Sequence, residues 1–323
     1  ISVLLSTTWF LSANEKADAG EYDSALNIYE QLKQYNDSTS LYTMYKGETD
    51  IYLRQNQIEK AINVIDAGIK ATNDDKLVKY KEWIKSNTLI TESHEKTHME
   101  QSASGSPIIN NDYTYTYDNK HNMVTKHEKS VVVMDKGTKW ESTSDSEMQY
   151  NYTYDEQGRK TQENIQGKRY NGDNVMSTNT YTYDNDGNVT IMYSNGDSVT
   201  KDSNGNIIME NGKSVTKKEY IEEYDDNGNL IKQTEKSSTA SWGPLDTYYS
   251  YDENGRCIQI KDNLKGTDRL FTLTLYEYDY MDNKIKYSYK MEGDALWGFS
   301  GRYENSEYSY VYEFVGDIKQ YNY

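Results

Sequence analysis

A short repeated pattern constrains the fold of this chain more than any other sequence feature. It is clearest in residues 181–190, which read Tyr-Thr-Tyr-Asp-Asn-Asp-Gly-Asn-Val-Thr. The two tyrosines are two positions apart, so in a β-strand their side chains lie on one face. The aspartate and the glycine fit the first and fourth positions of a type I turn. The pattern therefore predicts a β-hairpin in which Gly187 has a positive φ.

Copies of this pattern follow one another through the last two thirds of the sequence. The copy at Asp279 lacks the glycine, and residues 310–313 form a degenerate last copy. The turn residues are Asp118, Asp155, Gly158, Asp184, Gly187, Asp202, Gly205, Asp225, Gly228, Asp252, Gly255 and Asp279. The tyrosine pairs, which are candidates for binding or for packing, are Tyr115 and Tyr117, Tyr152 and Tyr154, Tyr181 and Tyr183, Tyr249 and Tyr251, Tyr276 and Tyr278, and Tyr310 and Tyr312.

The number of copies predicts how the hairpins assemble. About eight hairpins give roughly sixteen strands, more than a twisted open sheet usually holds without curling or splitting. We therefore expect one curled antiparallel meander over residues 113–323. Its tyrosine rows should lie on the concave face, and the first tyrosine of most pairs should be buried. Each tyrosine can be explained either by sheet packing or by a surface that stacks on sugar rings or protein partners.

Composition narrows the class of protein. The chain of 323 residues carries 52 acidic and 35 basic residues, a net charge of −17, which disfavours nucleic acid as a partner. Tyrosine is abundant, at 33 residues, while aliphatic residues are sparse. We expect a thin amphipathic sheet in place of a thick aliphatic core. Cys257 is the single cysteine, so the sequence has no disulfide framework.

Residues 1–87 have a different, helical pattern. Residues 20–26 and 56–62 can be superimposed with a shift of 36 positions, which aligns Ala25 with Ala61. A small residue at a close helix crossing, with a bulky residue one turn later, resembles the tetratricopeptide repeat. Asp74 or Asp75 is expected to cap one further helix. Two readings stay open for this domain: a helical spacer, or a groove that binds a partner peptide.

Residues 88–112 are expected to link the two domains. This segment contains Gln101–Pro107, a polar stretch typical of a flexible linker. The fold class that follows is α and β in separate domains: residues 1–87 helical, residues 88–112 a polar linker, and residues 113–323 an all-β repeat domain.

One short motif suggests chemistry. His94, Glu95 and His98 match H-E-x-x-H, the zinc-protease motif, which requires a helix that places both histidines on one face, and a third ligand. The charged surroundings and the position next to a polar linker favour a chance match. We therefore expect no metal site, no cofactor and no enzymatic activity.

The hairpin copies resemble the Rhs/YD repeats of bacterial surface and toxin-encapsulating proteins. The resemblance covers about residues 113–323, and in that family the repeats build curled antiparallel sheets with proposed carbohydrate or protein binding. The combination of these hairpin repeats with tetratricopeptide-like helices resembles uncharacterised surface proteins and lipoproteins of Gram-positive gut bacteria. The resemblance implies an extracellular or cell-surface location, with a possible membrane anchor upstream of Ile1.

The first functional expectation is adhesion to a carbohydrate or protein ligand through the tyrosine-rich sheet. The alternative is a scaffold or assembly factor whose helices bind a partner peptide. A zinc hydrolase comes third.

Overall fold

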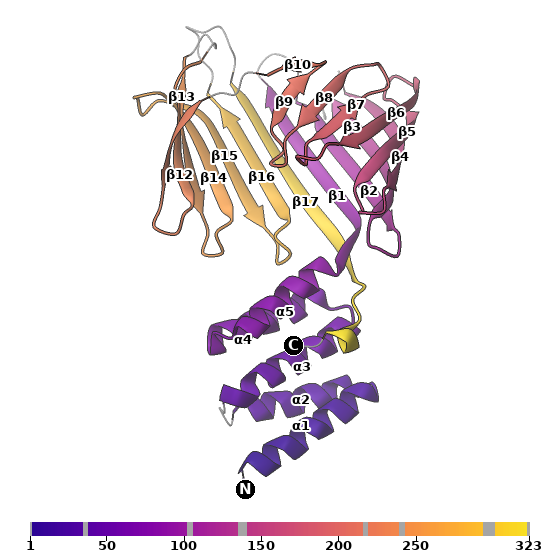
Figure 1. Ribbon diagram of the computed structural model, residues 1–323, viewed down its shortest axis with the longest axis vertical. Helices are drawn as coiled ribbons and strands as arrows, with labels where there is room; N and C mark the ends of the chain where they lie inside the picture. The colour runs from indigo at the N-terminus through magenta and orange to yellow at the C-terminus, as the bar shows by residue number, and fades with distance from the viewer. Residues whose placement is uncertain are drawn as a thin grey trace. The chain divides into compact units, whose positions relative to one another are not determined.

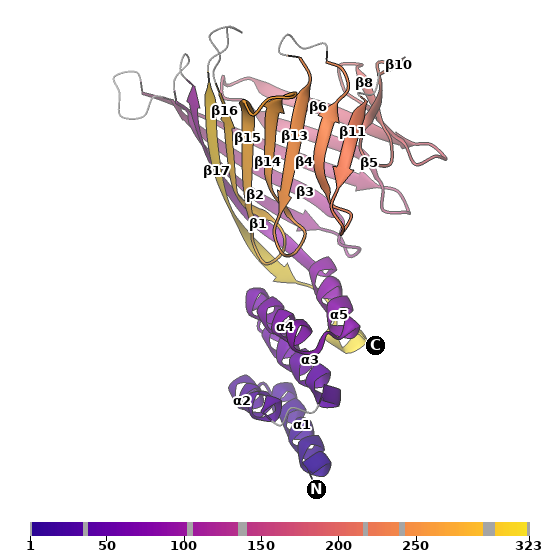
Figure 2. The ribbon, with the colours of Figure 1, turned by 90° about the vertical axis from the view of Figure 1, so that its left-hand side faces the viewer.

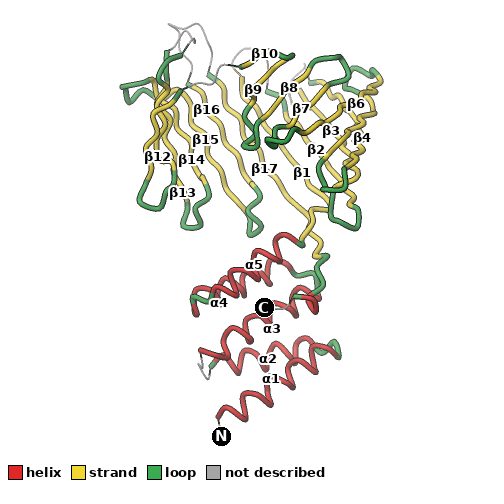
Figure 3. Tube along the Cα trace, viewed as in Figure 1, coloured by secondary structure: helices red, strands yellow, loops and turns green. Residues whose placement is uncertain are grey.

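The computed structural model describes residues 2–34, 38–101, 106–134, 141–215, 219–238, 243–292 and 301–321. These residues form five α-helices followed by a 17-stranded antiparallel sheet, as Figures 1 and 3 show. The expected fold class is thereby confirmed. The chain divides into two compact units, residues 1–91 with 311–323, and residues 92–310.

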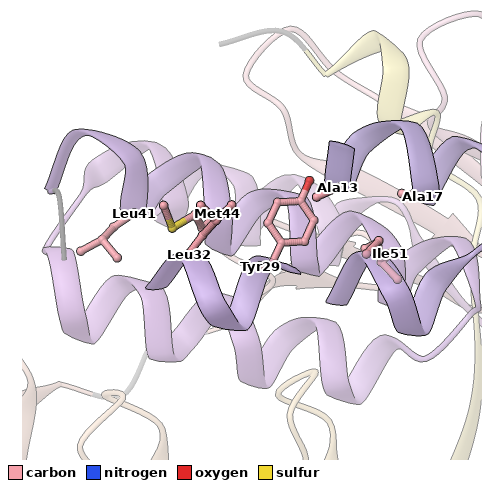
Figure 4. Close-up of a cluster of buried hydrophobic side chains, with 8 residues drawn as sticks. Ala13, Ala17, Tyr29, Leu32, Leu41, Met44 and Ile51 are labelled. Carbon is pink, nitrogen blue, oxygen red and sulfur yellow. The ribbon is translucent and has the colours of Figure 1, made fainter. Parts of the chain in front are cut away.

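Unit 1 is built on helices that pack through small residues. The helices are α1 (Ser2–Asp18), α2 (Tyr22–Lys33), α3 (Ser38–Arg54), α4 (Ile58–Thr72) and α5 (Asp75–Ser86). Ala25 and Ala61 are fully buried, as the aligned segments predict. Tyr29 is buried beside Ala13 in the cluster shown in Figure 4. Among the described residues, no helix has the length and apolar content needed to cross a membrane.

The expected cap of the last helix is Asp74, whose carboxylate accepts a hydrogen bond of 2.8 Å from the backbone N–H of Lys76. This bond satisfies one of the free donors of the first helical turn. Leu77, Tyr80 and Ile84 of α5 are buried, as the one-sided apolar pattern requires.

The C-terminal residues belong to unit 1, which corrects the boundary of the predicted β domain at residue 323. The ring of Phe314 contacts Trp83 edge-on at 5.6 Å, and the ring of Tyr321 lies 4.5 Å from that of Tyr80. The side chain of Asn56 also holds this segment, because its Oδ1 accepts from the backbone N–H of Phe314 at 3.0 Å. Burial of aromatic surface drives this association.

Unit 2 consists of strands and turns, and its sheet curls (Figures 1 and 2). The strands are β1 (Thr88–Gln101), β2 (Ile108–Tyr117), β3 (Met123–Met134), β4 (Ser142–Tyr154), β5 (Lys160–Lys168), β6 (Asn174–Tyr183), β7 (Val189–Met192), β8 (Ser198–Lys201), β9 (Ile207–Glu210), β10 (Lys213–Ser214), β11 (Tyr220–Tyr224), β12 (Leu230–Glu235), β13 (Leu245–Tyr251), β14 (Cys257–Leu264), β15 (Leu270–Tyr278), β16 (Lys284–Met291) and β17 (Arg302–Phe314). The ends of β1 and β17 extend into unit 1.

The strands follow one another in chain order, with one exception. Strand β1 pairs with both β2 and β17, so the first and last strands are neighbours within the sheet. The described pairings then run from β2 to β10 on one side, and from β17 back to β11 on the other. Meanders are therefore present over β2 to β10 and over β11 to β17, and β1 joins them. The expectation of one continuous meander is wrong, because no ladder among the described residues pairs β10 with β11, and these two strands are the ends of the sheet.

The prediction of a linker over residues 88–112 is wrong for the described part of that segment. Residues 88–101 form β1, and residues 92–98 pair with residues 108–114 of β2. Residues 102–105 lie outside the described part of the chain. The linker prediction failed because both faces of β1 carry polar side chains, so the strand has no apolar alternation.

Each predicted turn has the same backbone structure. At the clearest copy the N–H of Gly187 donates to Asp184 O at 3.3 Å, and the N–H of Asp184 donates to Asn188 O at 3.1 Å. The φ of Gly187 is 80°, as predicted. The copies at Asp118 and Asp279 form the same turn with His121 and Asp282 at the fourth position, at φ of 64° and 65°.

A second interaction in the turn was not recognised from the sequence. The Nδ2 of Asn188 donates to Asp184 Oδ2 at 2.7 Å, and the backbone N–H of Asn188 donates to Oδ1 at 2.8 Å. Arg159 and Arg256 occupy the same fifth position and bond the turn aspartate through Nε. The recurring asparagine or arginine after the glycine was the available signal.

Replacing Gly187 by valine is expected to lower the free energy of unfolding by about 1–3 kcal/mol, since a β-branched residue at positive φ is strained. Urea unfolding measures the change. Asn185→Ala, in the same exposed turn, is the control and should stay within about 0.5 kcal/mol of the parent. Equal effects of the two substitutions would contradict the turn assignment.

Candidate functional site: the tyrosine face of the sheet

The paired tyrosines lie on a single face of the sheet, which we call the Tyr face. Cross-strand partners share a face, so the register connects the pairs. Tyr152 is opposite Glu163, and Glu163 is opposite Asn179, which is two residues before Tyr181. On the other side of β1, Tyr276 is opposite Tyr287, and Tyr287 is opposite Ser306.

The same face continues across the middle of the sheet. The hydroxyl of Thr97 in β1 contacts that of Ser306 in β17 at 2.6 Å. Ser93, four residues before Thr97, is opposite Tyr113 of β2. One-sided tyrosine rows are therefore confirmed from β2 to β6 and from β13 to β17. We assign the Tyr face to the inside of the curl because its side chains alternate with more exposed ones on the other face.

The tyrosines of the pairs are half-buried, so the expectation that the first members would be mostly buried is wrong. Fully buried residues on this face are small and polar, such as Ser130 and Ser306, each 2% exposed. Among its described residues unit 2 has no helix that could cover the face. A single curled layer leaves the edges of large rings in solvent, and tyrosine tolerates this through its hydroxyl.

At the turns that begin at Asp155, Asp184, Asp252 and Asp279, the tyrosine immediately before the turn connects its hairpin to the preceding one. Its hydroxyl donates to a backbone carbonyl at the start of the earlier returning strand. The bonds are Tyr154 to Met123 O at 2.6 Å, Tyr183 to Lys160 O at 2.9 Å, Tyr251 to Leu230 O at 2.9 Å and Tyr278 to Cys257 O at 2.7 Å. The second tyrosines therefore have a structural role.

The last copy was assigned in the wrong phase. Tyr310 was expected to be the first member of a pair with Tyr312, yet its hydroxyl donates to Lys284 O at 2.9 Å, the contact made by second members elsewhere. Tyr308 and Tyr310 thus form the last pair on the Tyr face. Tyr312 belongs to unit 1. The phase was misread because β17 extends past the point where the other copies turn.

Charged residues surround the other tyrosines. The Nζ of Lys126 lies 4.5 Å from the ring centroid of Tyr113 and 4.7 Å from that of Tyr150, and 3.0 Å from Glu128. The hydroxyl of Tyr113 donates to Glu95 at 3.3 Å. Such cation–π contacts contribute about 0.5–1 kcal/mol each when exposed. Sequence reasoning missed these lysines, which recur as Lys160 and Lys284 on later strands.

Burial raises the pKa of Tyr150 and Tyr181 to about 12, and the carboxylates of Glu128 and Glu163 beside them add to the effect. The pKa of Tyr152 is raised for the same reasons, first by burial and then by Glu163. Deprotonation of these hydroxyls would place a second negative charge beside each glutamate. The Tyr face therefore depends on neutral tyrosines.

The protein is expected to lose stability at alkaline pH. A pKa raised on folding gives stability that is fully present below the unfolded value, about 10, and is lost as the pH rises toward the folded value. Urea midpoints should be constant between about pH 7 and 9 and fall from about pH 10 to 12. Spectrophotometric titration of tyrosinate checks the cause. Titration of all tyrosines near the ordinary value would contradict it.

The H-E-x-x-H residues lie in strand β1. Side chains alternate in a strand, so Glu95 projects to the face opposite His94 and His98. Glu95 accepts from Asn111 Nδ2 at 2.9 Å on the Tyr face, while His94 Nδ1 lies 2.6 Å from Asp112 on the other face. This arrangement differs from the helical one that zinc proteases use. The described residues include no cluster of ligating side chains suited to a metal ion.

Unit 1 contains a shallow pocket of about 380 Å³. Its lining residues are Leu53, Arg54, Asn56, Thr91, Val311, Tyr312, Glu313 and Phe314. Half of them come from the C-terminal segment, so the pocket lies where that segment rests on the helices.

Comparison with known proteins gives no family. No protein-family model matches the chain, and no curated protein matches it. Among solved structures, a porin-like protein from Bacteroides uniformis is 9% identical with a TM-score of 0.33, covering 69% of this chain and 98% of that chain. A beta-barrel-like protein of a domain of unknown function from Brucella abortus is 7% identical with a TM-score of 0.33, covering 71% and 99%.

The structure of TcdB2-TccC3 is 15% identical with a TM-score of 0.24, covering 70% of this chain. The match spans only 14% of that chain. The function proposed below does not rest on these similarities.

Proposed function

We propose that this chain is a non-enzymatic binding protein, secreted or on the bacterial cell surface, that holds a carbohydrate or protein ligand on its Tyr face. The observation that carries the proposal is the half-exposed state of the paired tyrosines on one continuous face. Half-exposed rings of this kind pack on their neighbours and remain accessible to a ligand. Partly exposed aromatic rings beside fixed polar groups are typical of surfaces that contact sugars or proteins.

The tyrosines of this face differ in their contacts. Second members of the pairs, such as Tyr183 and Tyr251, donate to backbone carbonyls and support the sheet. Several others have a lysine over the ring, as Tyr276 has Lys284 at 4.0 Å. Among the first members of the pairs that end at Tyr117, Tyr154, Tyr183, Tyr251 and Tyr278, Tyr115 and Tyr249 have no cation over their rings from the described part of the chain, so we choose these two as candidates for ring stacking.

The polar groups beside Tyr115 and Tyr249 are fixed by hydrogen bonds. The hydroxyl of Tyr115 contacts Ser93 Oγ at 2.8 Å, and that of Tyr249 donates to Gln233 Oε1 at 3.3 Å. The rings are therefore held in place before a ligand arrives, which lowers the entropic cost of binding. The location is inferred from the YD-type hairpins and from the polar composition.

The placement of the H-E-x-x-H residues does not support the zinc-hydrolase alternative. A zinc hydrolase needs Glu95 near the metal held by His94 and His98, and the strand turns it away from both. We therefore do not propose a hydrolase.

Binding of the full-length chain to a glycan array, and capture of surface proteins, test the proposal. Tyr115→Ala and Tyr249→Ala should each weaken binding by about fivefold or more, the effect of losing a contact worth about 1 kcal/mol. Tyr303→Ala is the matched control, since Tyr303 is exposed on the opposite face. Thermal unfolding shows that each variant is folded. Retained binding in both Tyr-face variants would overturn the proposal.

A second candidate function is peptide binding by the helices, and one observation favours it. The side chain of Asn56 holds the backbone of an extended segment, donating to Tyr312 O at 3.3 Å and accepting from the N–H of Phe314 at 3.0 Å. A side-chain amide that hydrogen-bonds to backbone groups can hold peptides of many different sequences, because every peptide has these groups. The occupant here is the chain's own C-terminal segment. Capture of a partner peptide that Asn56→Ala abolishes and Gln55→Ala leaves unchanged would support this function, and equal capture by both variants would exclude it.

A further inference from the structure

The Tyr face contains a recurring cluster in which a lysine on one strand lies between tyrosines of the two neighbouring strands. Lys126 of β3 lies over Tyr113 of β2 and Tyr150 of β4. Lys160 of β5 lies over Tyr152 of β4 and Tyr181 of β6, at 4.4 and 5.1 Å. A glutamate accompanies each lysine strand: Glu128 on β3 and Glu163 on β5.

Strand β11 carries two tyrosines and a glutamate and has no lysine. It differs from the clusters above in that its tyrosines and its glutamate share one strand. Its sequence places Tyr220, Glu222 and Tyr224 on one face. Glu222 is opposite Gln233, and Gln233 is opposite Thr247, two residues before Tyr249, so this is the Tyr face. Glu222 accepts from the Tyr224 hydroxyl at 2.7 Å and from Gln233 Nε2 at 3.0 Å.

The opposite face of the same strand pair is balanced in charge. Glu223 lies 3.3 Å from Lys232, and Glu219, just before β11, lies 3.1 Å from Lys236. Glu222 has no cation beside it from the described part of the chain. The acid on the Tyr face is therefore the one that a positive group from outside could neutralise.

Backbone groups of β11 next to Glu222 point away from the neighbouring strand β12. The carbonyl of Glu219 accepts from the N–H of Lys236 at 2.9 Å. Because direction alternates along an antiparallel strand, Ile221 and Glu223 also bond toward β12. The N–H and C=O groups of Tyr220 and Glu222 consequently point to the other side, where no described strand pairs with β11.

The described part of this edge lacks two of the features that usually protect an edge against added strands, lysine and proline. Natural sheets block exposed edges with lysine, proline or very short strands. The other end of the sheet, β10, has two residues and includes Lys213. Strand β11 has five residues, all exposed, with neither lysine nor proline, and Tyr224 and Ile221 are 55% and 54% exposed.

We propose that the edge of β11 accepts an extended segment of a partner protein, which adds a strand to the sheet and places a lysine opposite Glu222. The backbone groups of Tyr220 and Glu222 supply the hydrogen bonds, and Tyr220 and Tyr224 lie on either side of Glu222 along β11, on the face that the lysine would share. Strand addition of this kind takes its affinity from the backbone and its specificity from alternate side chains. The proposal stands apart from ligand binding on the Tyr face.

The test uses the full-length chain and a synthetic nine-residue peptide of alternating threonine and lysine, with a second peptide in which glutamine replaces lysine. Isothermal titration should show tighter binding of the lysine peptide. Glu222→Gln should weaken that binding by about fivefold or more, as expected for loss of a cross-strand charge pair with a flanking cation–π contact. Glu223→Gln, on the other face of the same strand, should leave it unchanged.

Hydrogen exchange locates the added strand. The amides of Tyr220 and Glu222 should exchange quickly in the free protein and slowly with the lysine peptide, while those of Ile221 and Glu223 are slow in both. Equal affinity for the two peptides, or an equal effect of the two substitutions, would overturn the proposal. Slow exchange of Tyr220 and Glu222 without peptide, in a dimer, would also overturn it, because a second copy would then be the occupant.

Discussion

Replacing Gly167 by alanine is expected to lower the free energy of unfolding by about 3 kcal/mol, from a strained φ together with overpacking. Gly167 has a φ of 156°, and a Cβ built on it would lie 2.1 Å from Glu147 O and 2.8 Å from the Cα of Met148. Both are backbone atoms of β4, the strand that pairs with β5. The added methyl group can be accommodated only if the two strands separate locally.

Gly172→Ala is the matched control in the same hairpin. It also has a positive φ, 85°, yet the nearest atom to its Cβ is the flexible Lys168 Cε at 3.8 Å. Gly172→Ala should lower the free energy of unfolding by the backbone strain alone, about 1–2 kcal/mol. Urea unfolding compares the two variants. Equal losses would show that the close contact between β4 and β5 is absent.

Tyr80→Ala should cost roughly 3–5 kcal/mol, the range for truncating a buried aromatic side chain. Tyr80 is fully buried, and its ring stacks on Trp83 at 5.6 Å and lies 4.5 Å from that of Tyr321. The Tyr80 hydroxyl also donates to Asp50. The substitution therefore removes ring contacts and a buried hydrogen bond together.

Two further variants separate these contributions. Tyr80→Phe keeps the ring and leaves Asp50 with Lys46, which lies 3.0 Å away, and should cost about 1–3 kcal/mol. Val78→Ala, at an exposed position of the same helix, should change stability by less than about 0.5 kcal/mol. Thermal or urea unfolding gives all three values. A small loss in Tyr80→Ala would mean that the C-terminal segment does not pack on α5.

Turn chemistry made the hairpins predictable from the sequence. Asp184 and Gly187 act within four residues, so their pattern specifies the turn without knowledge of the rest of the fold. The same reasoning undervalued Asp282 and His121, which adopt a positive φ without being glycine. Aspartate, asparagine and histidine are the residues that most often do so.

Long-range pairing could not be read from the sequence. The bond between Asn56 and Phe314 joins residues 258 positions apart, and no local pattern indicates it. Strand β1 was missed for another reason. Its residues on the Tyr face, such as Ser93, Glu95 and Thr97, are polar because that face is polar, so the hydrophobic alternation that identifies strands is absent.

The candidate site was predictable in its placement and not in its detail. The spacing of Tyr181 and Tyr183 places both on one face of any strand, and the sheet extends this to the other pairs. The lysines were missed because a contact between a lysine amine and a tyrosine ring on a neighbouring strand depends on the register of the two strands. The half-exposed state was missed because no local pattern indicates that small polar residues such as Ser306 are the buried ones on this face.

Footprinting of the tyrosines with bound ligand tests the central claim, that the Tyr face is a binding surface. Hydroxyl-radical labelling of the full-length chain, with and without the glycan or protein retained in the binding screen, reports the accessibility of each side chain. Tyr115 and Tyr249 should become protected, while Tyr303 on the opposite face should keep its reactivity. Protection of Tyr303, with Tyr115 and Tyr249 still labelled, would contradict it.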